Sequence, residues 1–245
     1  MEDKVLLSTE VASGAEKAEL LIVIPAYNEA ENIERVVNHL TANFPQYDYV
    51  VVNDGSRDET AAICQRNGYN LLNLPVNLGL AGAFQAGLKY ADKYGYQYAV
   101  QLDGDGQHCP EYLESMIKKM EEGYDIVIGS RFVGEKKPFT MRMLGSNLIE
   151  MAIRFTTGVN IKDPTSGMRM FSKRMIREFA SGLNYGPEPD TVSYLIRQGA
   201  RVAEVPVIMD ERILGVSYLT PVNAMRYMLK MLISILLIQN FRKRR

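Results

Sequence analysis

Two aspartates one residue apart, Asp103 and Asp105, are the residues of this chain best suited to chemistry. They follow the apolar run Tyr98–Leu102, which predicts a buried strand, and the glycines between and after them let the backbone approach a ligand. Alternation along a strand predicts that both carboxylates share one face with Gln107. Such oxygen ligands suit Mg or Mn, which are usually bound by one or two carboxylates and substrate phosphates. The turn therefore predicts a metal–diphosphate site; an acidic turn that only hydrogen-bonds its own backbone is the alternative.

Short strands and helices alternate through the first half of the chain. Further buried strands are predicted from the apolar runs Leu20–Ile24, Tyr49–Val52, Asn70–Leu74 and Asp125–Gly129. Helices are predicted over Ala30–Leu40 (capped by Asn28 or Glu29), Glu59–Asn67, Asn77–Lys93 and Pro110–Glu122. This alternation predicts an α/β fold with a mostly parallel, doubly wound sheet.

Three polar loops follow predicted strands directly, over Ala26–Glu29, Asn53–Asp58 and Asp103–Gln107. In doubly wound sheets, ligands collect at the carboxyl ends of the strands. We therefore expect the three loops to face one cleft.

The second half contains longer helices. Phe139–Thr156 has the apolar spacing of an amphipathic helix, and helices over Lys173–Ser181 and Thr191–Gln198 precede a strand over Arg201–Met209. There is no repeat and no linker. The sequence therefore predicts a flexible lead-in over residues 1–19, one catalytic domain over 20–220 and a separate helix with a basic tail over 221–245.

The composition narrows the class of protein. The 245 residues carry a net charge of −1, so nothing suggests a nucleic-acid partner. Cys64 and Cys109 form no motif, which suggests a reduced, cytosolic compartment. Met1–Glu19 has no apolar core, so we do not expect a signal peptide.

The C-terminal stretch Val222–Phe241 predicts an apolar helix with a narrow polar stripe. Its apolar run Met231–Ile238 is shorter than the roughly 20 residues that span a bilayer, and Arg242–Arg245 follows. This pattern predicts a helix that lies on the surface of an anionic membrane. The alternative is a helix packed on the domain, or on a second copy in a homo-oligomer.

Six motifs carry a family resemblance. In chain order they are Ile24–Glu29 (IPAYNE), Asn53–Asp58 (NDGSRD), Asn77–Gly79 (NLG), Asp103–His108 (DGDGQH), Gly129–Arg131 (GSR) and Thr165–Arg169 (TSGMR). Together they resemble family 2 glycosyltransferases, especially dolichol-phosphate mannosyltransferases and their bacterial undecaprenyl-phosphate relatives. The resemblance covers roughly residues 20–218.

The resemblance implies a GT-A fold that transfers a sugar, with inversion, from a nucleotide-diphospho-sugar to a lipid-linked phosphate or another acceptor, with Mg or Mn as cofactor. It implies that the donor is bound by Pro25, Tyr27, Glu29, Asp54, Asp103 and Arg212. The metal would be held by Asp103, Asp105 and Gln107. His108, next to this turn, is given no catalytic role.

Arginines are expected to bind phosphate oxygens, because a guanidinium can pair with them bidentately. Arg131 and Arg169 lie inside matching motifs and, with Asp105 and Asp163, are expected to be catalytic. The family commonly has a lysine soon after the serine of Glu211–Tyr218, where this chain has Tyr218. Another cation, with Arg212 as the candidate, would have to replace that lysine.

The type of acceptor decides whether a base is needed. A sugar hydroxyl must lose a proton, for which Asp163, Glu188 and Asp190 are candidates, although capping and loop rigidity would equally explain them. A phosphate is already anionic at neutral pH. Three hypotheses follow. The first is a peripheral enzyme on the cytoplasmic membrane face that moves a hexose or N-acetylhexosamine from a UDP-sugar to polyprenyl phosphate. The second is the same enzyme with a glycan or protein-linked sugar as acceptor, and the third is a non-catalytic scaffold that binds a nucleotide sugar.

Overall fold

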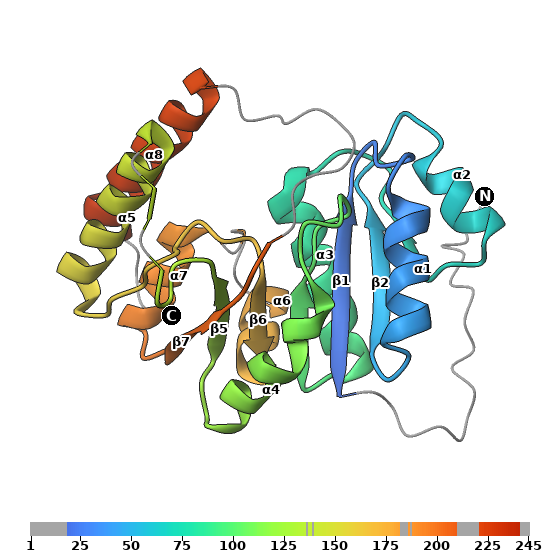
Figure 1. Ribbon diagram of the computed structural model, residues 1–245, viewed down its shortest axis with the longest axis horizontal. Helices are drawn as coiled ribbons and strands as arrows, with labels where there is room; N and C mark the ends of the chain where they lie inside the picture. The colour runs from blue at the N-terminus through green and yellow to red at the C-terminus, as the bar shows by residue number, and fades with distance from the viewer. Residues whose placement is uncertain are drawn as a thin grey trace. The chain divides into compact units, whose positions relative to one another are not determined.

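The computed structural model describes residues 19–135, 137–138, 140–181, 186, 188–209 and 221–240, without the side chains of 141, 142, 221–223 and 240. The chain divides into two compact units (Figure 1). Unit 1 consists of Met1–Pro110, Met170–Gly186 and Asp210–Gly215, and unit 2 of Glu111–Arg169, Pro187–Met209 and Val216–Arg245.

Unit 1 is built on strands in the order β3-β2-β1-β4-β6. Their bounds are Leu20–Ala26 for β1, Asp48–Asn53 for β2, Leu71–Asn73 for β3, Tyr98–Gln101 for β4 and Arg169–Ser172 for β6. The pairs of β1 with β2, β1 with β4 and β2 with β3 are parallel, and β4 with β6 is antiparallel. All seven residues of β1 are buried, as its continuous apolar run predicts.

The helices of unit 1 are α1 (Ile33–Asn43), α2 (Thr60–Arg66), α3 (Gly79–Tyr94) and α6 (Lys173–Ser181). Three phenylalanines join α3, β6 and α6: the ring centroid of Phe171 lies 5.7 Å from that of Phe84 and 5.3 Å from that of Phe179. These ring contacts pack α6 into the hydrophobic core to which β4 also belongs.

Unit 2 contains β5 (Ile126–Ser130) and β7 (Val202–Pro206), which pair in parallel. Its helices are η1 (Pro110–Tyr112, whose first residue belongs to unit 1), α4 (Leu113–Glu121), α5 (Met141–Thr157), α7 (Pro189–Arg197), α8 (Pro221–Leu236) and η2 (Ile238–Asn240). Helices α5 and α8 lie side by side (Figure 1), and α7 packs against both.

The predicted α/β class with mostly parallel strand pairs is confirmed. One local prediction is wrong, and another stays a prediction that strand geometry no longer supports. Helix α1 begins at Ile33 rather than Ala30, after a turn in which the N–H groups of Glu29 and Ala30 donate to Thr60 Oγ1 at 2.9 Å and to Asp58 Oδ2 at 3.1 Å. Strand β4 ends at Gln101, so strand alternation does not place the side chains of the acidic turn. The domain boundaries drawn from the sequence remain predictions.

None of the helices within the described residues is both long enough and apolar enough to cross a membrane.

Candidate functional site

Three loops meet at the carboxyl edge of the strands in unit 1. The backbone N–H of Asp54 donates to the Ala26 carbonyl at 2.9 Å. The loops after β1 and β2 also exchange bonds, because Asn28 N donates to Ser56 Oγ at 3.0 Å and Arg57 N donates to Asn28 Oδ1 at 2.9 Å. The loops after β1 and β2 therefore adjoin one another, and the expectation that all three loops face one cleft stays a prediction.

A chain of polar contacts extends from Glu29 to the acidic turn. Asn32 Nδ2 donates to Glu29 Oε2 at 2.9 Å, and Arg35 Nη2 donates to the Asp105 carbonyl at 2.9 Å. Gly104 lies so close to β1 that a Cβ there would be 3.1 Å from the Pro25 carbonyl oxygen. A larger residue here would push the acidic turn and β1 apart by a few tenths of an ångström, so Gly104 permits their close approach.

The expected donor-binding residues Pro25, Tyr27 and Asp54 lie at this same edge. Pro25 is buried inside β1, and Tyr27, which follows β1, is half-buried. The buried carboxylate of Asp54 accepts the backbone N–H of Leu78 at 2.7 Å, which joins the loop after β2 to the start of α3. Gly55 (φ 65°) leaves no space for a Cβ, which would be 2.8 Å from the backbone of residues 76 and 77.

Asp103 is the more open carboxylate of the acidic turn, with 32% of its side chain exposed. Gln101 Nε2 donates to Asp103 Oδ1 at 2.9 Å. His108 is buried; its Nδ1 accepts the backbone N–H of Asp103 at 3.0 Å, and its Nε2 lies 3.7 Å from Asp103 Oδ2. These neighbours fix the backbone and the carboxylate of Asp103 together.

Asp105 and Gln107 complete the turn. Asp105 is buried, and its Oδ1 accepts the backbone N–H of Gln107 at 3.0 Å. The described residues contain no group of three or more His, Cys, Asp and Glu side chains placed to hold a metal. The three side chains expected to hold the metal, Asp103, Asp105 and Gln107, offer oxygen donors, and this donor chemistry fits Mg or Mn.

Two further expected site residues, Arg131 and Asp163, form an ion pair in unit 2. Arg131 Nε and Nη2 donate to the two carboxylate oxygens of Asp163 at 2.7 and 2.9 Å, and the Arg131 backbone N–H donates at 3.2 Å. Asp163 is 0% exposed, and Glu204 accepts its backbone N–H at 2.8 Å. This carboxylate is therefore placed to orient Arg131 rather than to accept a proton from a substrate.

Arg169, the first residue of β6, belongs to unit 2 and is also buried. Its Nη2 donates to the Pro164 carbonyl at 2.7 Å, whereas its Nε has no partner among the described residues. Burial lowers the pKa of this guanidinium, and the neighbouring Glu188 opposes that shift.

Glu188 and Asp190 lie at the start of α7 and are bonded to α8 and η2. Tyr227 donates to Glu188 Oε2. Ser234 Oγ and Gln239 Nε2 donate to Asp190 Oδ2 at 2.6 and 3.3 Å. The backbone N–H of Thr191 donates to Asp190 Oδ1 at 2.8 Å.

Sequence reasoning missed several of these neighbours. Gln101 could have been found, because it is a polar residue on an otherwise apolar strand. His108 was recognised only as a turn residue. Tyr227 had no signal, since it lies 39 residues from Glu188. Arg212 and the Glu211–Tyr218 stretch lie outside the described residues.

Solved structures show which class of protein has this fold. A complex of glucosyl-3-phosphoglycerate synthase from Mycobacterium tuberculosis with Mn²⁺, UDP-glucose and phosphoglyceric acid superimposes with a TM-score of 0.68 at 18% identity, covering 91% of this chain and 79% of that one. The fold is thus the GT-A fold of nucleotide-sugar transferases.

Sequence comparison gives the family. The family model described as "Glycosyl transferase family 2" matches residues 21–179. Polyprenol monophosphomannose synthase of Mycolicibacterium smegmatis is 32% identical over 86% of this chain and 84% of its own length. Undecaprenyl-phosphate mannosyltransferase of Micrococcus luteus is 31% identical over 81% and 86%. The chain belongs to glycosyl transferase family 2.

Proposed function

We propose that this protein transfers a hexose from a nucleotide-diphospho-sugar to a polyprenyl phosphate at the cytoplasmic face of the membrane. Support comes from the two relatives above, whose names specify a polyprenyl-phosphate product or acceptor and which align over more than four fifths of their length.

One observation carries the choice of a phosphate over a hydroxyl acceptor. Each of the three carboxylates considered as a base, Asp163, Glu188 and Asp190, already accepts hydrogen bonds from other side chains. As the base for a hydroxyl acceptor, one of them would have to take a proton while it already serves these partners, and a protonated Asp163 would lose its ion pair with Arg131. A phosphate monoester needs no such base, and its charge is matched by arginines.

The proposed reaction forms one bond and breaks one. A phosphate oxygen of the acceptor attacks the anomeric carbon, and the bond from that carbon to the diphosphate breaks with inversion. Within unit 1, Asp103, Asp105 and Gln107 would hold the metal, and Pro25, Tyr27, Glu29 and Asp54 would line the nucleotide pocket. When bound, the metal would neutralise charge on the leaving diphosphate. Within unit 2, Arg131, oriented by Asp163, and Arg169 would supply positive charge for phosphate.

The donor is the least constrained part of the proposal. The sequence resemblance led us to expect a UDP-sugar, whereas both relatives are named for mannose. Mannose is therefore the first sugar to test, with both uridine and guanosine donors.

The proposal is tested by incubating the protein with radiolabelled UDP- and GDP-sugars, one at a time, with Mn²⁺ or Mg²⁺ and polyprenyl phosphate in detergent. We expect one donor to give label in the organic phase that mild acid releases and EDTA prevents. Donor hydrolysis without lipid label would point to a glycan or protein acceptor. An absence of turnover with every donor would favour the scaffold hypothesis.

A further inference from the structure

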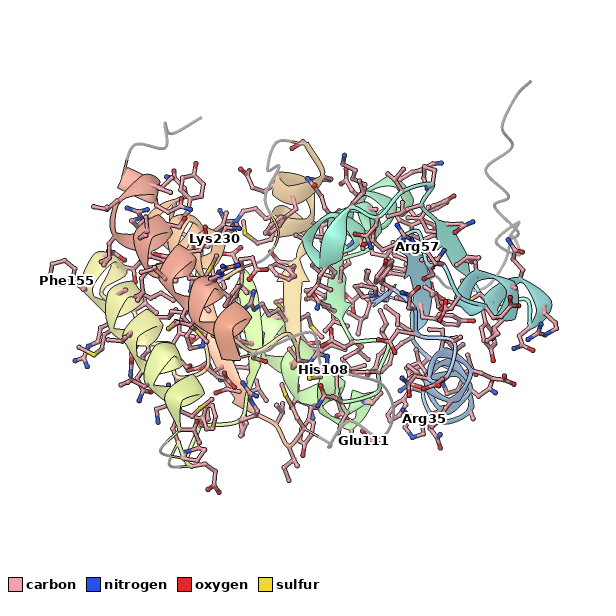
Figure 2. The ribbon with its side chains drawn as sticks, turned by 90° about the horizontal axis from the view of Figure 1, so that it is seen from above. Arg35, Arg57, His108, Glu111, Phe155 and Lys230 are labelled. Atoms are coloured by element: carbon pink, nitrogen blue, oxygen red, sulfur yellow. The ribbon has the colours of Figure 1, made fainter. Side chains whose placement is uncertain are left out.

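Exposed large apolar side chains are concentrated on two helices of unit 2. On α5 they are Leu144, Leu148, Met151 and Phe155. On α8 they are Met225, Leu229, Ile233 and Leu236, followed by Leu237 and Ile238. Phe155 is 86% exposed, Met225 66% and Met151 65%, and Phe155 points away from the unit (Figure 2). We call these ten side chains the α5–α8 face.

Each helix contributes one stripe to this face. The four positions on α5, and the four on α8 itself, are spaced three or four residues apart, so each set lies along one side of its helix. The opposite side of each helix is buried, as Ile149 and Ile153 on α5 and Met231 and Ile235 on α8 show. Both helices therefore pack into the unit and still expose apolar area.

The two stripes adjoin one another. Gly145 on α5 faces Met228 on α8, and a Cβ at Gly145 would lie 2.8 Å from Met228 Cγ. This close contact brings the helix axes together along the pair seen in Figure 1. Single exposed apolar residues are common on soluble proteins, but a continuous patch of this kind marks an interaction surface.

Basic residues border the face on both outer edges. Arg154 is nine residues from Gly145, which is two and a half helical turns, so it points away from α8. Arg226 and Lys230 are each two residues from Met228, a rotation of about 200°, so they point away from α5. All three are exposed.

The charge of these segments selects the partner. Residues 141–157 and 221–245 contain eight basic residues and one acidic residue, whereas the whole chain has a net charge of −1. A second copy of this face would bring like charges together along its edges. An anionic lipid surface accepts apolar side chains between its headgroups and attracts basic side chains at the edges.

We propose that the α5–α8 face docks on a bilayer that contains anionic phospholipid, with α5 and α8 lying in the interface. The sequence named the C-terminal helix as the membrane contact and Phe139–Thr156 as a second amphipathic helix; the structure adds that their exposed apolar sides adjoin one another. This docking is independent of any sugar transfer, so either proposal can fail without the other.

The test is flotation of the full chain with vesicles of phosphatidylcholine, alone or mixed with phosphatidylglycerol, without nucleotide sugar. One variant carries Met151→Gln and Phe155→Gln on α5, and a second carries Met225→Gln and Leu229→Gln on α8. We expect each pair to weaken binding to anionic vesicles at least tenfold. Lys230→Gln should weaken it about fivefold, and less so at high salt.

The matched control is Leu78→Gln with Leu80→Gln, two apolar residues of unit 1 that are about as exposed as Leu229. This control should bind like the unmodified chain. Thermal melting checks that every variant is folded, since exposed substitutions change stability little.

Three results would overturn the proposal. The first is that the unmodified chain does not float with anionic vesicles. The second is that both face variants bind as well as the control. The third is a stable dimer in solution that either face variant dissociates, which would make the face an interface between copies of this chain.

Discussion

The acidic turn of unit 1 and the polar cluster of unit 2 (Arg131, Asp163, Arg169, Glu188 and Asp190) both gather charged residues, but they use them differently. In the turn, Asp103 Oδ1 accepts from the Gln101 amide, the Asp103 backbone N–H donates to His108, and about a third of the Asp103 side chain is exposed. In the cluster, Asp163 is bound on both oxygens by Arg131 and is not exposed at all.

The contrast shows how to separate a ligand-binding carboxylate from a structural one. A buried carboxylate that already has a cation is expensive to unpair, and so it positions its partner. A carboxylate fixed by neutral donors keeps its negative charge for an incoming cation. On this criterion Asp103 is the metal-binding candidate and Asp163 is a positioning residue.

The largest effect is expected from Asp103→Asn. Loss of one metal-binding charge should lower the rate of sugar transfer about 10³-fold, with little change in the melting temperature because the side chain is partly exposed. Steady-state assays with the identified donor measure this. Glu111→Gln, an exposed carboxylate close to the turn in sequence (Figure 2), should behave like the unmodified enzyme.

The main effect of Asp163→Asn should be a loss of folding stability. It leaves Arg131 without its buried counter-charge, which should lower the free energy of unfolding by about 3 kcal/mol in urea denaturation. Asp92→Asn, which removes a surface ion pair with Arg177, should cost less than about 1 kcal/mol. An unchanged free energy of unfolding would contradict the structural role given to Asp163.

Gln101→Leu tests the support of Asp103 without touching a ligand. The variant removes the amide that fixes Asp103 Oδ1, so the Mn²⁺ concentration for half-maximal activity should rise about 10- to 100-fold. The rate at saturating metal should largely recover. The control is Gln85→Leu, which removes the amide that donates to the Phe179 carbonyl and should leave the Mn²⁺ dependence unchanged. If both variants raise the half-maximal Mn²⁺ concentration equally, Gln101 has no specific effect on the metal site.

Tyr227→Phe should have the smallest effect. Its hydroxyl donates to Glu188, and burial together with that carboxylate raises the pKa of Tyr227, which keeps it a donor. Removing the hydroxyl should lower the free energy of unfolding by roughly 1–2 kcal/mol. The control is Tyr47→Phe, at a half-buried tyrosine of unit 1. If both variants unfold with the same free energy, the hydrogen bond from Tyr227 to Glu188 does not stabilise the protein.

The sequence predicted those features that depend on local pattern and on sheet topology. The run Leu20–Ile24 has the composition of a strand buried on both faces, and β1 contains it. Once the strands are taken as parallel, the positions of the loops after β1, β2 and β4 follow, because parallel strands end at the same edge. The motif residues of unit 1 were placed for this reason.

Hydrogen bonds and ion pairs between residues far apart in the sequence could not be predicted. Asn28 and Glu29 are good helix caps by residue type, but Asn28 bonds to the loop after β2 and Glu29 accepts from Asn32. The sequence made Asp163 a candidate base, because no residue near it in the sequence indicates that Arg131 binds its carboxylate. Of the polar stripe predicted on the C-terminal helix, Arg226 and Lys230 are exposed while Ser234 is buried against Asp190.

The bonds between α7 and α8 have a consequence for how the protein is made. Unit 2 draws on three separate stretches of chain, and Met231, Ile235 and Ser234 are part of its interior. During synthesis the N-terminal parts of a chain emerge first. Asp190 and the apolar sides of α5 and α7 therefore lack their partners on α8 until α8 has been translated. The complete α5–α8 face therefore exists only after that point, so the growing chain would reach the membrane late.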